Sequence, residues 1–211
     1  KMFDINLYIF NLIPPLGFFI LNVFIPGPNV LNTIATSMGS GRTSGIACAL
    51  ATGLGVILTA LLALFGAAIL FYKVPLIYNS LTIVGGILLI YFAKRYLQKA
   101  LSSGQKLIAI ENIKSKVAFR QAFLVLLSNP KMMTTYLAVI SLFPIVASNT
   151  QYVIIFSLMA GMASFLGHFI FATIFSTQII SIVYMKLYRL INAFVGFGFI
   201  LYSLKLFLTI L

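Results

Sequence analysis

Two short proline motifs, Pro-Gly-Pro-Asn at residues 26–29 and Asn-Pro-Lys at residues 129–131, interrupt long apolar stretches of this chain. Proline has no backbone N–H and clashes with the preceding turn, so each motif must break a helix. In hydrocarbon, each freed backbone group costs several kcal/mol unless protein or a water-filled cavity satisfies it. Paired interruptions in corresponding places of two halves therefore indicate the ligand site of a transporter.

The residues around these two breaks are suited to an amino-acid zwitterion. A half-helix that begins after a break has free N–H groups and a positive dipole end, which attract a carboxylate. The asparagines of both motifs can donate and accept hydrogen bonds. The candidate substrate-binding residues are Pro26, Gly27, Pro28, Asn29, Asn32, Thr33, Asn129, Pro130, Lys131 and Thr134.

Lys131 and the threonines each have a second interpretation. A lysine inside a membrane helix costs at least about 2.5 kcal/mol on insertion scales, which favours a functional role in substrate contact. The alternative is that Lys131 binds the backbone carbonyls freed at the break. Threonines likewise either line a polar cavity or bond back to their own helix.

His168 is the only histidine and Cys48 the only cysteine of the chain. Histidine alone titrates near neutral pH unperturbed, so we hypothesise that His168 carries or gates a coupled proton. The alternative is a hydrogen-bonded histidine between helices. A single cysteine provides no disulfide, CxxC pair or thiolate metal site. We predict no metal site, no cofactor and, without a nucleophile–base arrangement, no enzyme.

The composition is that of a membrane protein. Of 211 residues, 62% are hydrophobic and only Asp4 and Glu111 are acidic, whereas soluble domains are roughly 25% charged. Successive windows of about 20 apolar residues predict an all-α polytopic membrane protein.

The formal charge of +12 could indicate a nucleic-acid partner, but its distribution predicts topology instead. Ten of the fourteen basic residues lie in three segments that fall on one side of the membrane in a six-crossing arrangement. These are Arg42, Lys94, Arg95, Lys99, Lys106, Lys114, Lys116, Arg120, Lys186 and Arg189. We expect anionic lipid headgroups, rather than nucleic acid, as their partners.

Six transmembrane helices are predicted as two inverted three-helix repeats. Residues 1–93 form the first repeat, 94–117 a basic cytoplasmic linker and 118–211 the second repeat; helices 1 and 4 are broken at the proline motifs. The helices are expected at about 7–38 (broken), 44–71, 76–93, 118–143 (broken), 152–175 and from 190 onward, with a tight turn at 39–42. Residues 84–91 are similar in sequence to residues 195–202, and Gly53 corresponds in position to Gly161. Because three crossings are an odd number, the second copy must insert upside down.

Over essentially its whole length, the chain resembles the lysine exporter / homoserine-threonine resistance (LysE/RhtB) family of amino-acid exporters. The resemblance rests on Pro-Gly-Pro-Asn at 26–29, Gly-Arg-x-x-Gly at 41–45, Asn-Pro-Lys at 129–131 and Phe-Pro at 143–144. It implies export of amino acids or their derivatives from the bacterial cytoplasm, driven by protons. Many members have Asp where this chain has Asn29, which removes the obvious proton-carrying carboxylate.

The remaining expectations concern substrate and location. The lack of intramembrane carboxylates argues against a cationic side chain, so a small neutral or aliphatic amino acid is expected. The alternative is a divalent metal-ion exporter of the same superfamily, whose site would require carboxylates, thiolates or clustered histidines. The expected location is the bacterial inner membrane, with basic loops in the cytoplasm and both termini outside. The oligomeric state, including a homodimer, is left open.

Overall fold

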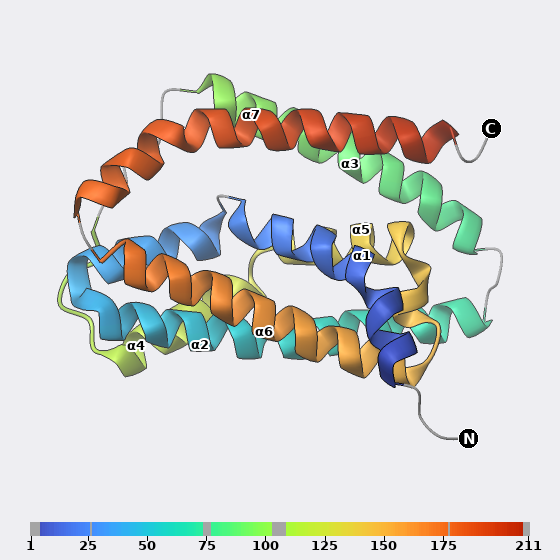
Figure 1. Ribbon diagram of the computed structural model, residues 1–211, viewed down its shortest axis with the longest axis horizontal. Coiled ribbons are helices and arrows are strands. Elements are labelled where there is room, and N and C mark those ends of the chain that lie inside the picture. The colour runs from blue at the N-terminus through green and yellow to red at the C-terminus, as the bar shows by residue number, and fades with distance from the viewer. Residues whose placement is uncertain (1–4, 26, 74–76, 103–108, 177, 209–211) are drawn as a thin grey trace.

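The computed structural model describes residues 5–25, 27–73, 77–102, 109–176 and 178–208, and every regular element in these ranges is a helix (Figure 1). In chain order the elements are α1 (Ile5–Phe24), α2 (Pro28–Lys73), α3 (Ile77–Leu101), α4 (Ser115–Leu127), α5 (Pro130–Leu142), the short 3-10 helix η1 (Pro144–Ala147), α6 (Thr150–Ile174) and α7 (Gln178–Leu208).

Both predicted helix breaks are confirmed. α1 ends at Phe24 and α2 begins at Pro28, while α4 ends at Leu127 and α5 begins at Pro130. Each new helix thus starts with proline, whose missing N–H would have had no helical partner at the first position. The axes of α4 and α5 differ by 52° across their break.

Gly41 divides α2 into two helical stretches, residues 28–40 and 42–73. A straight helix of 46 residues would be about 69 Å long, roughly twice the hydrocarbon core of a bilayer. Gly41 has φ 82° and ψ 170°, a backbone conformation that favours glycine. Figure 1 shows the chain reversing its direction within α2, so the predicted turn at 39–42 is confirmed.

Helix ends near the basic linker differ from the prediction. α3 continues to Leu101 instead of ending at Ala93, α4 starts at Ser115 instead of Ala118, and α7 starts at Gln178 instead of Leu190. For α3 the reason is that the Lys, Arg, Gln, Ala and Leu residues of 94–101 are good helix formers, so a polar composition does not end the helix.

Residues 109–114 of the linker, which precede α4, are hydrogen-bonded to α2 on both sides of its turn. The N–H of Ile110 donates to the carbonyl of Ala35 at 3.0 Å, and Ser44 Oγ donates to the carbonyl of Ile113 at 3.0 Å. This segment is therefore attached to the body of the protein by its backbone.

Among the described residues, Pro28–Ile69 and Thr150–Ile174 are long and apolar enough to cross a membrane. The bent pair formed by α4 and α5 provides a third span if the two helices are one crossing. Large apolar side chains are exposed along these helices, for example Leu62, which is 68% exposed, and Met162. An outward apolar surface of this kind is stable in lipid, and the chain is a helical membrane protein.

α2 and α6 form the central seam of the molecule. A Cβ added to Gly53 would lie 3.1 Å from the carbonyl oxygen of Gly161, and one added to Gly161 would lie 2.9 Å from that of Gly53. The two backbones therefore touch without side chains between them, as small residues allow in membrane helices. Gly53 therefore serves the packing of α2 on α6.

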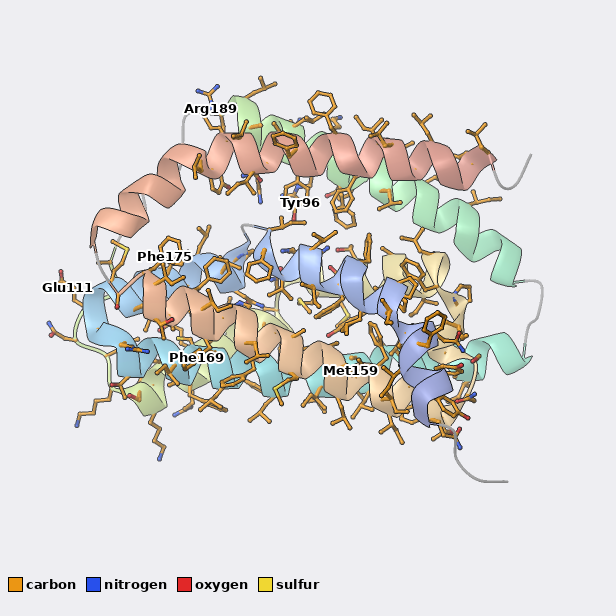
Figure 2. The ribbon with its side chains drawn as sticks, in the orientation of Figure 1. Tyr96, Glu111, Met159, Phe169, Phe175 and Arg189 are labelled. Atoms are coloured by element: carbon orange, nitrogen blue, oxygen red, sulfur yellow. The ribbon has the colours of Figure 1, made fainter. Side chains whose placement is uncertain are left out.

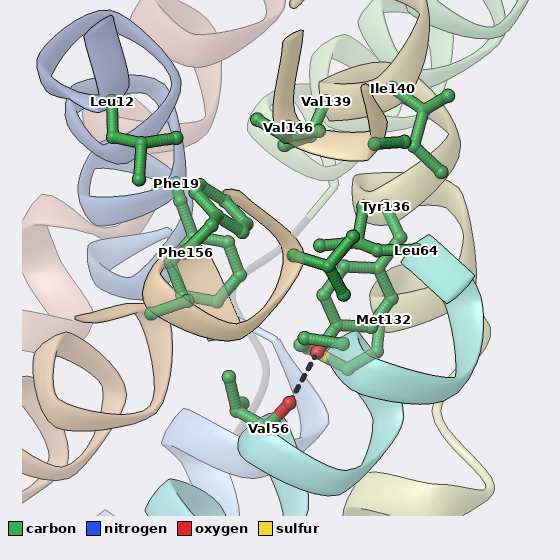
Figure 3. Packing of buried hydrophobic residues seen from close by; sticks show 14 of the residues in the cluster. Leu12, Phe19, Val56, Leu64, Met132, Tyr136, Val139, Ile140, Val146 and Phe156 are labelled. Carbon is green, nitrogen blue, oxygen red and sulfur yellow. Dashed lines mark hydrogen bonds between the residues drawn. The ribbon is translucent and has the colours of Figure 1, made fainter. Parts of the chain in front are cut away.

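One apolar cluster holds α1, α2, α5 and α6 together (Figure 3). Phe19 of α1 packs edge-on against Phe156 and stacks with Tyr136. The hydroxyl of Tyr136 is 2.8 Å from Thr59 Oγ1 and donates to the carbonyl of Val56 at 3.2 Å, so its polar end is satisfied inside the core. By contrast, α3 and α7 pair with each other along one edge of the molecule (Figure 1).

Candidate functional site

The C-terminal end of α1 is bound by a side chain from α5. Lys131 Nζ donates to the carbonyl of Asn22 at 2.8 Å and to that of Ile25 at 2.9 Å. The carbonyl of Ile25 comes after the last residue of α1 and has no following helical N–H, whereas the carbonyl of Asn22 also accepts the N–H of Ile25 at 3.2 Å. Because a lysine ammonium has three donors, one hydrogen of Lys131 remains for another acceptor. The predicted alternative role of Lys131, binding freed carbonyls, is thus seen directly, and it leaves room for substrate contact.

The N-terminal end of α5 is satisfied locally. Asn129 occupies the N-cap position, and its Oδ1 accepts a hydrogen bond from the N–H of Lys131 at 3.0 Å. The side-chain oxygen of Asn129 is therefore used by its own helix. The cap also satisfies one of the free N–H groups that would otherwise attract an anion to the start of α5.

The N-terminal end of α2 is arranged differently. The first helical hydrogen bond runs from the N–H of Leu31 to the carbonyl of Gly27 at 2.9 Å, so the N–H groups of Asn29 and Val30 precede the hydrogen-bonded turns. Asn29 is 7% exposed, and among the described residues its Oδ1 has no hydrogen-bond partner. Asn29 lies inside its helix, past the position from which a side chain caps.

These three helix ends surround a small cavity, the inner chamber, of about 20 Å³. Such a volume is sufficient for one water molecule. Its lining residues come from α1, α2, α5 and α6 and from the two breaks: Phe19, Asn22, Val23, Gly27, Asn29, Val30, Asn129, Lys131, Met132, Thr135, Ser164 and His168. The predicted residues Gly27, Asn29, Asn129, Lys131 and His168 are therefore brought together at one place.

His168 contributes a hydrogen-bond acceptor to the wall of the inner chamber. Its Nδ1 lies 2.9 Å from the carbonyl oxygen of Ser164, one turn earlier on α6. Because a carbonyl only accepts, Nδ1 must carry the hydrogen, and Nε2 of the neutral ring is then an acceptor. His168 is 4% exposed, and among the described residues its Nε2 has no partner.

A second, larger cavity of about 200 Å³, the vestibule, lies on the other side of Lys131. It is lined by Gly27, Pro28, Tyr91, Phe92, Arg95, Tyr96, Lys99, Asn129, Lys131 and Thr134. Figure 2 shows Tyr96 pointing from the pair of α3 and α7 toward the other helices.

The vestibule is cationic with aromatic walls. Arg95 donates to the hydroxyl of Tyr91 at 3.1 Å with its guanidinium over the same ring, and the Lys99 ammonium lies 5.4 Å from the centre of the Tyr96 ring. The only carboxylate in the described part of the chain, Glu111, lies exposed at the end of the molecule (Figure 2). Cations that lie near one another without a neutralising carboxylate attract an anion.

The partition between the vestibule and the inner chamber is formed by residues that line both cavities: Gly27, Asn129 and Lys131. A Cβ on Gly27 would lie 3.1 Å from Lys131 Cδ and 3.4 Å from Lys131 Nζ. The lysine side chain therefore lies directly over this glycine, and the partition depends on the small residue below it.

The other predicted substrate-binding residues lie elsewhere or only on the vestibule. Thr134 and Pro28 line the vestibule alone. Asn32 accepts from Gln121 Nε2 at 3.2 Å and faces α4, and Thr33 Oγ1 donates to the carbonyl of Asn29. Pro26 and the side chain of Pro130 fall outside the described residues.

Residues that sequence reasoning missed line both cavities. Asn22 and Ser164 join the inner chamber, and Arg95 and Lys99 of α3 join the vestibule. Proximity to a proline motif could not reveal Ser164, which lies far from both breaks in sequence. The basic residues of α3 were assigned to the linker because the helix was predicted to end before them.

An all-helical chain with apolar spans and a polar chamber between two interrupted helices has the architecture of a membrane transporter. The chain belongs to the family of LysE type translocators, whose family model matches residues 20–209.

Among curated proteins, the chain is 32% identical over 129 residues to the uncharacterized membrane protein YahN of Escherichia coli (strain K12), covering 59% of this chain and 56% of that protein. It is 28% identical over 116 residues to leucine efflux proteins of Salmonella choleraesuis (strain SC-B67) and Salmonella typhimurium (strain LT2), covering 55% of each chain. The matches thus span a little over half of these relatives. No solved structure matches the chain significantly.

Proposed function

We propose that this protein exports small neutral or aliphatic amino acids from the bacterial cytoplasm in exchange for protons. The observation that carries the proposal is the position of Lys131, which lies between a cationic vestibule and an inner chamber with two acceptors that have no partner among the described residues. A zwitterion needs cations for its carboxylate and acceptors for its ammonium. Leucine efflux by two of the relatives agrees with this substrate class.

The substrate carboxylate would bind at the vestibule side of the partition. The remaining hydrogen of Lys131 provides a donor there. Arg95 and Lys99 would attract the carboxylate into the vestibule, and Tyr91, Phe92 and Tyr96 offer an apolar surface to an aliphatic side chain.

Export of a divalent metal ion is the less suitable alternative. Three cationic side chains, Arg95, Lys99 and Lys131, line the vestibule and would repel a divalent cation on its way to the chamber. The charges at the vestibule therefore favour an anionic group on the substrate.

The proposed topology has six crossings, arranged as two inverted three-helix repeats. Its support is the symmetry of the packing: α1 packs on α6 as α4 packs on α2, while α2 pairs with α6 and α3 with α7. Residues expected to be equivalent, Gly53 and Gly161, meet each other at the α2–α6 seam. Two copies related by a two-fold axis would produce these pairings.

The membrane orientation can be tested with the single cysteine removed. In a Cys48→Ala background, new cysteines at Arg42 and at Ser148 would report opposite sides to an impermeant thiol reagent. We expect Arg42→Cys to be labelled from the cytoplasm and Ser148→Cys from outside. Labelling of both from one side would contradict the proposed topology.

Transport is tested with the purified full chain in proteoliposomes. Counterflow of labelled leucine, alanine, threonine and lysine is measured with and without a pH gradient, with cadmium and zinc ions as the competing class. We expect leucine to move, faster when the gradient is present. Movement of the metal ions alone would contradict the proposal.

A further inference from the structure

We infer that the inner chamber is an ammonium subsite, in which Asn29 Oδ1 and His168 Nε2 hold the substrate amine and His168 Nε2 takes the exchanged proton in its place. The inference rests on the proposed function and deepens it. It specifies the orientation of the bound substrate, with the ammonium in the inner chamber and the carboxylate at the vestibule.

The first observation is that both groups are acceptors. The carbonyl of Ser164 fixes the hydrogen of His168 on Nδ1, which leaves a lone pair on Nε2. Asn29 Oδ1 is an acceptor by its chemistry. A buried acceptor without a partner is costly, so two at one small cavity indicate that a donor normally binds there.

The second observation is that the two groups come from different helices that form the central seam. Asn29 is on α2 and His168 on α6, and both residues are more than nine-tenths buried. A donor with several hydrogens can connect them, as one ammonium or one water does. Ammonium is the stronger partner because hydrogen bonds from a charged donor are roughly twice as strong as neutral ones.

The third observation is the charge around the chamber. Lys131 is the other titratable residue among the described lining residues, and its ammonium is already held by the carbonyls of Asn22 and Ile25. The substrate ammonium would avoid Lys131 and approach the acceptors, while the carboxylate would approach Lys131. The zwitterion is therefore oriented by the chamber itself.

Competition at His168 Nε2 provides a physical basis for exchange. A proton on Nε2 turns the acceptor into a charged donor, which repels an ammonium. The amine and the proton therefore cannot occupy the site together. After the amino acid is released outside, the protein would return to its inward-open state with a proton on His168 Nε2 in place of the amine. No covalent step is required.

The test compares ligands that each lack one charged group. Leucine counterflow is measured in proteoliposomes of the full chain against unlabelled leucine, its α-hydroxy analogue and isoamylamine, which lacks the carboxylate. For the unmodified protein we expect leucine to compete roughly 10- to 100-fold better than the α-hydroxy analogue. Asn29→Leu should remove most of this preference while leaving the preference for leucine over isoamylamine.

Asn29→Asp is the matched control, because it keeps an acceptor at the same place and should preserve the preference for the amine. If Asn29→Leu weakens leucine and the α-hydroxy analogue equally, the ammonium subsite is wrong even though the protein transports amino acids. If the unmodified protein moves no amino acid, the proposed function itself has failed.

His168 is tested by separating binding from coupling. His168→Gln keeps an acceptor but cannot take the proton, so leucine should still be preferred over its α-hydroxy analogue while a pH gradient no longer accelerates transport. Unchanged acceleration by the gradient would remove His168 from the proton path. Correct folding of each variant is checked by its elution as a single species in detergent.

Discussion

The two helix breaks have similar sequences, but their backbone groups are satisfied in different ways. At the second break, Asn129 caps the helix that it precedes, and the bond is made between neighbours in sequence. At the first break, the carbonyls of Asn22 and Ile25 are bound by Lys131, which is more than a hundred residues away. One break is locally complete, and the other depends on the second half of the protein.

This difference separates the two asparagines as well. Asn129 precedes its proline, so as the N-cap its side chain can accept from the free N–H groups of the first turn of α5. Asn29 follows its proline and lies within the first turn of α2. The oxygen of Asn29 therefore has no described partner. The first break is thus where the protein keeps unused hydrogen-bonding capacity, which is what a ligand requires.

The largest effect is expected from Lys131→Met. The substitution leaves the carbonyl of Ile25 without its partner, which should lower the free energy of unfolding by about 1–3 kcal/mol, and it removes the cation proposed to bind the carboxylate. Leucine counterflow should be lost while the protein still elutes as a folded species. Lys131→Arg, which keeps donors for the carbonyls, is the control. Full transport by Lys131→Met would show that the first break does not depend on the second half.

Asn29→Ala should affect transport without lowering stability. Loss of one hydrogen bond to a charged group weakens substrate affinity about tenfold or more. Because Oδ1 has no described partner, its removal leaves no group unsatisfied, and thermal unfolding should occur at the same temperature or higher. A clear loss of thermal stability would instead assign Asn29 a structural role like that of Asn129.

Asn129→Ala should produce the opposite pattern. Removing an N-cap costs about 1 kcal/mol, so chemical denaturation should show a destabilised protein. The preference among leucine analogues should remain, because the cap contacts its own helix. Asn129→Asp restores a capping oxygen and should restore stability, and a failure to do so would contradict the local cap.

Gly27→Ala should have the smallest effect. The added Cβ would come 3.1 Å from Lys131 Cδ, so the lysine must shift by a few tenths of an ångström. We expect counterflow to fall a few-fold, with a stability change within about 1 kcal/mol. Gly17→Ala in α1 is the matched control, because nothing lies within 4 Å of its added Cβ and it should leave counterflow unchanged.

Sequence reasoning located the chamber but not all of its walls. Prolines have local effects, so the helix breaks and the turn at Gly41 could be predicted from a few neighbouring residues. Ser164 and Arg95 reach the cavities only through the packing of α6 and α3. Because the helices are apolar on all sides, their sequences do not indicate which faces pack against one another.

By itself, the sequence determined that this chain is a helical membrane protein with two broken helices, because backbone groups in lipid must be satisfied and proline prevents that locally. It also singled out Lys131, because an ionisable group is costly in hydrocarbon, and His168, because histidine titrates near neutral pH. Only the tertiary structure decided which atoms are already occupied. Lys131 binds α1, Asn129 caps α5, and Asn29 and His168 hold acceptors at one chamber for which the described part of the chain offers no partner. Hydrogen bonds between helices depend on distances between residues far apart in the chain, and the spacing of residues along the sequence does not determine these distances.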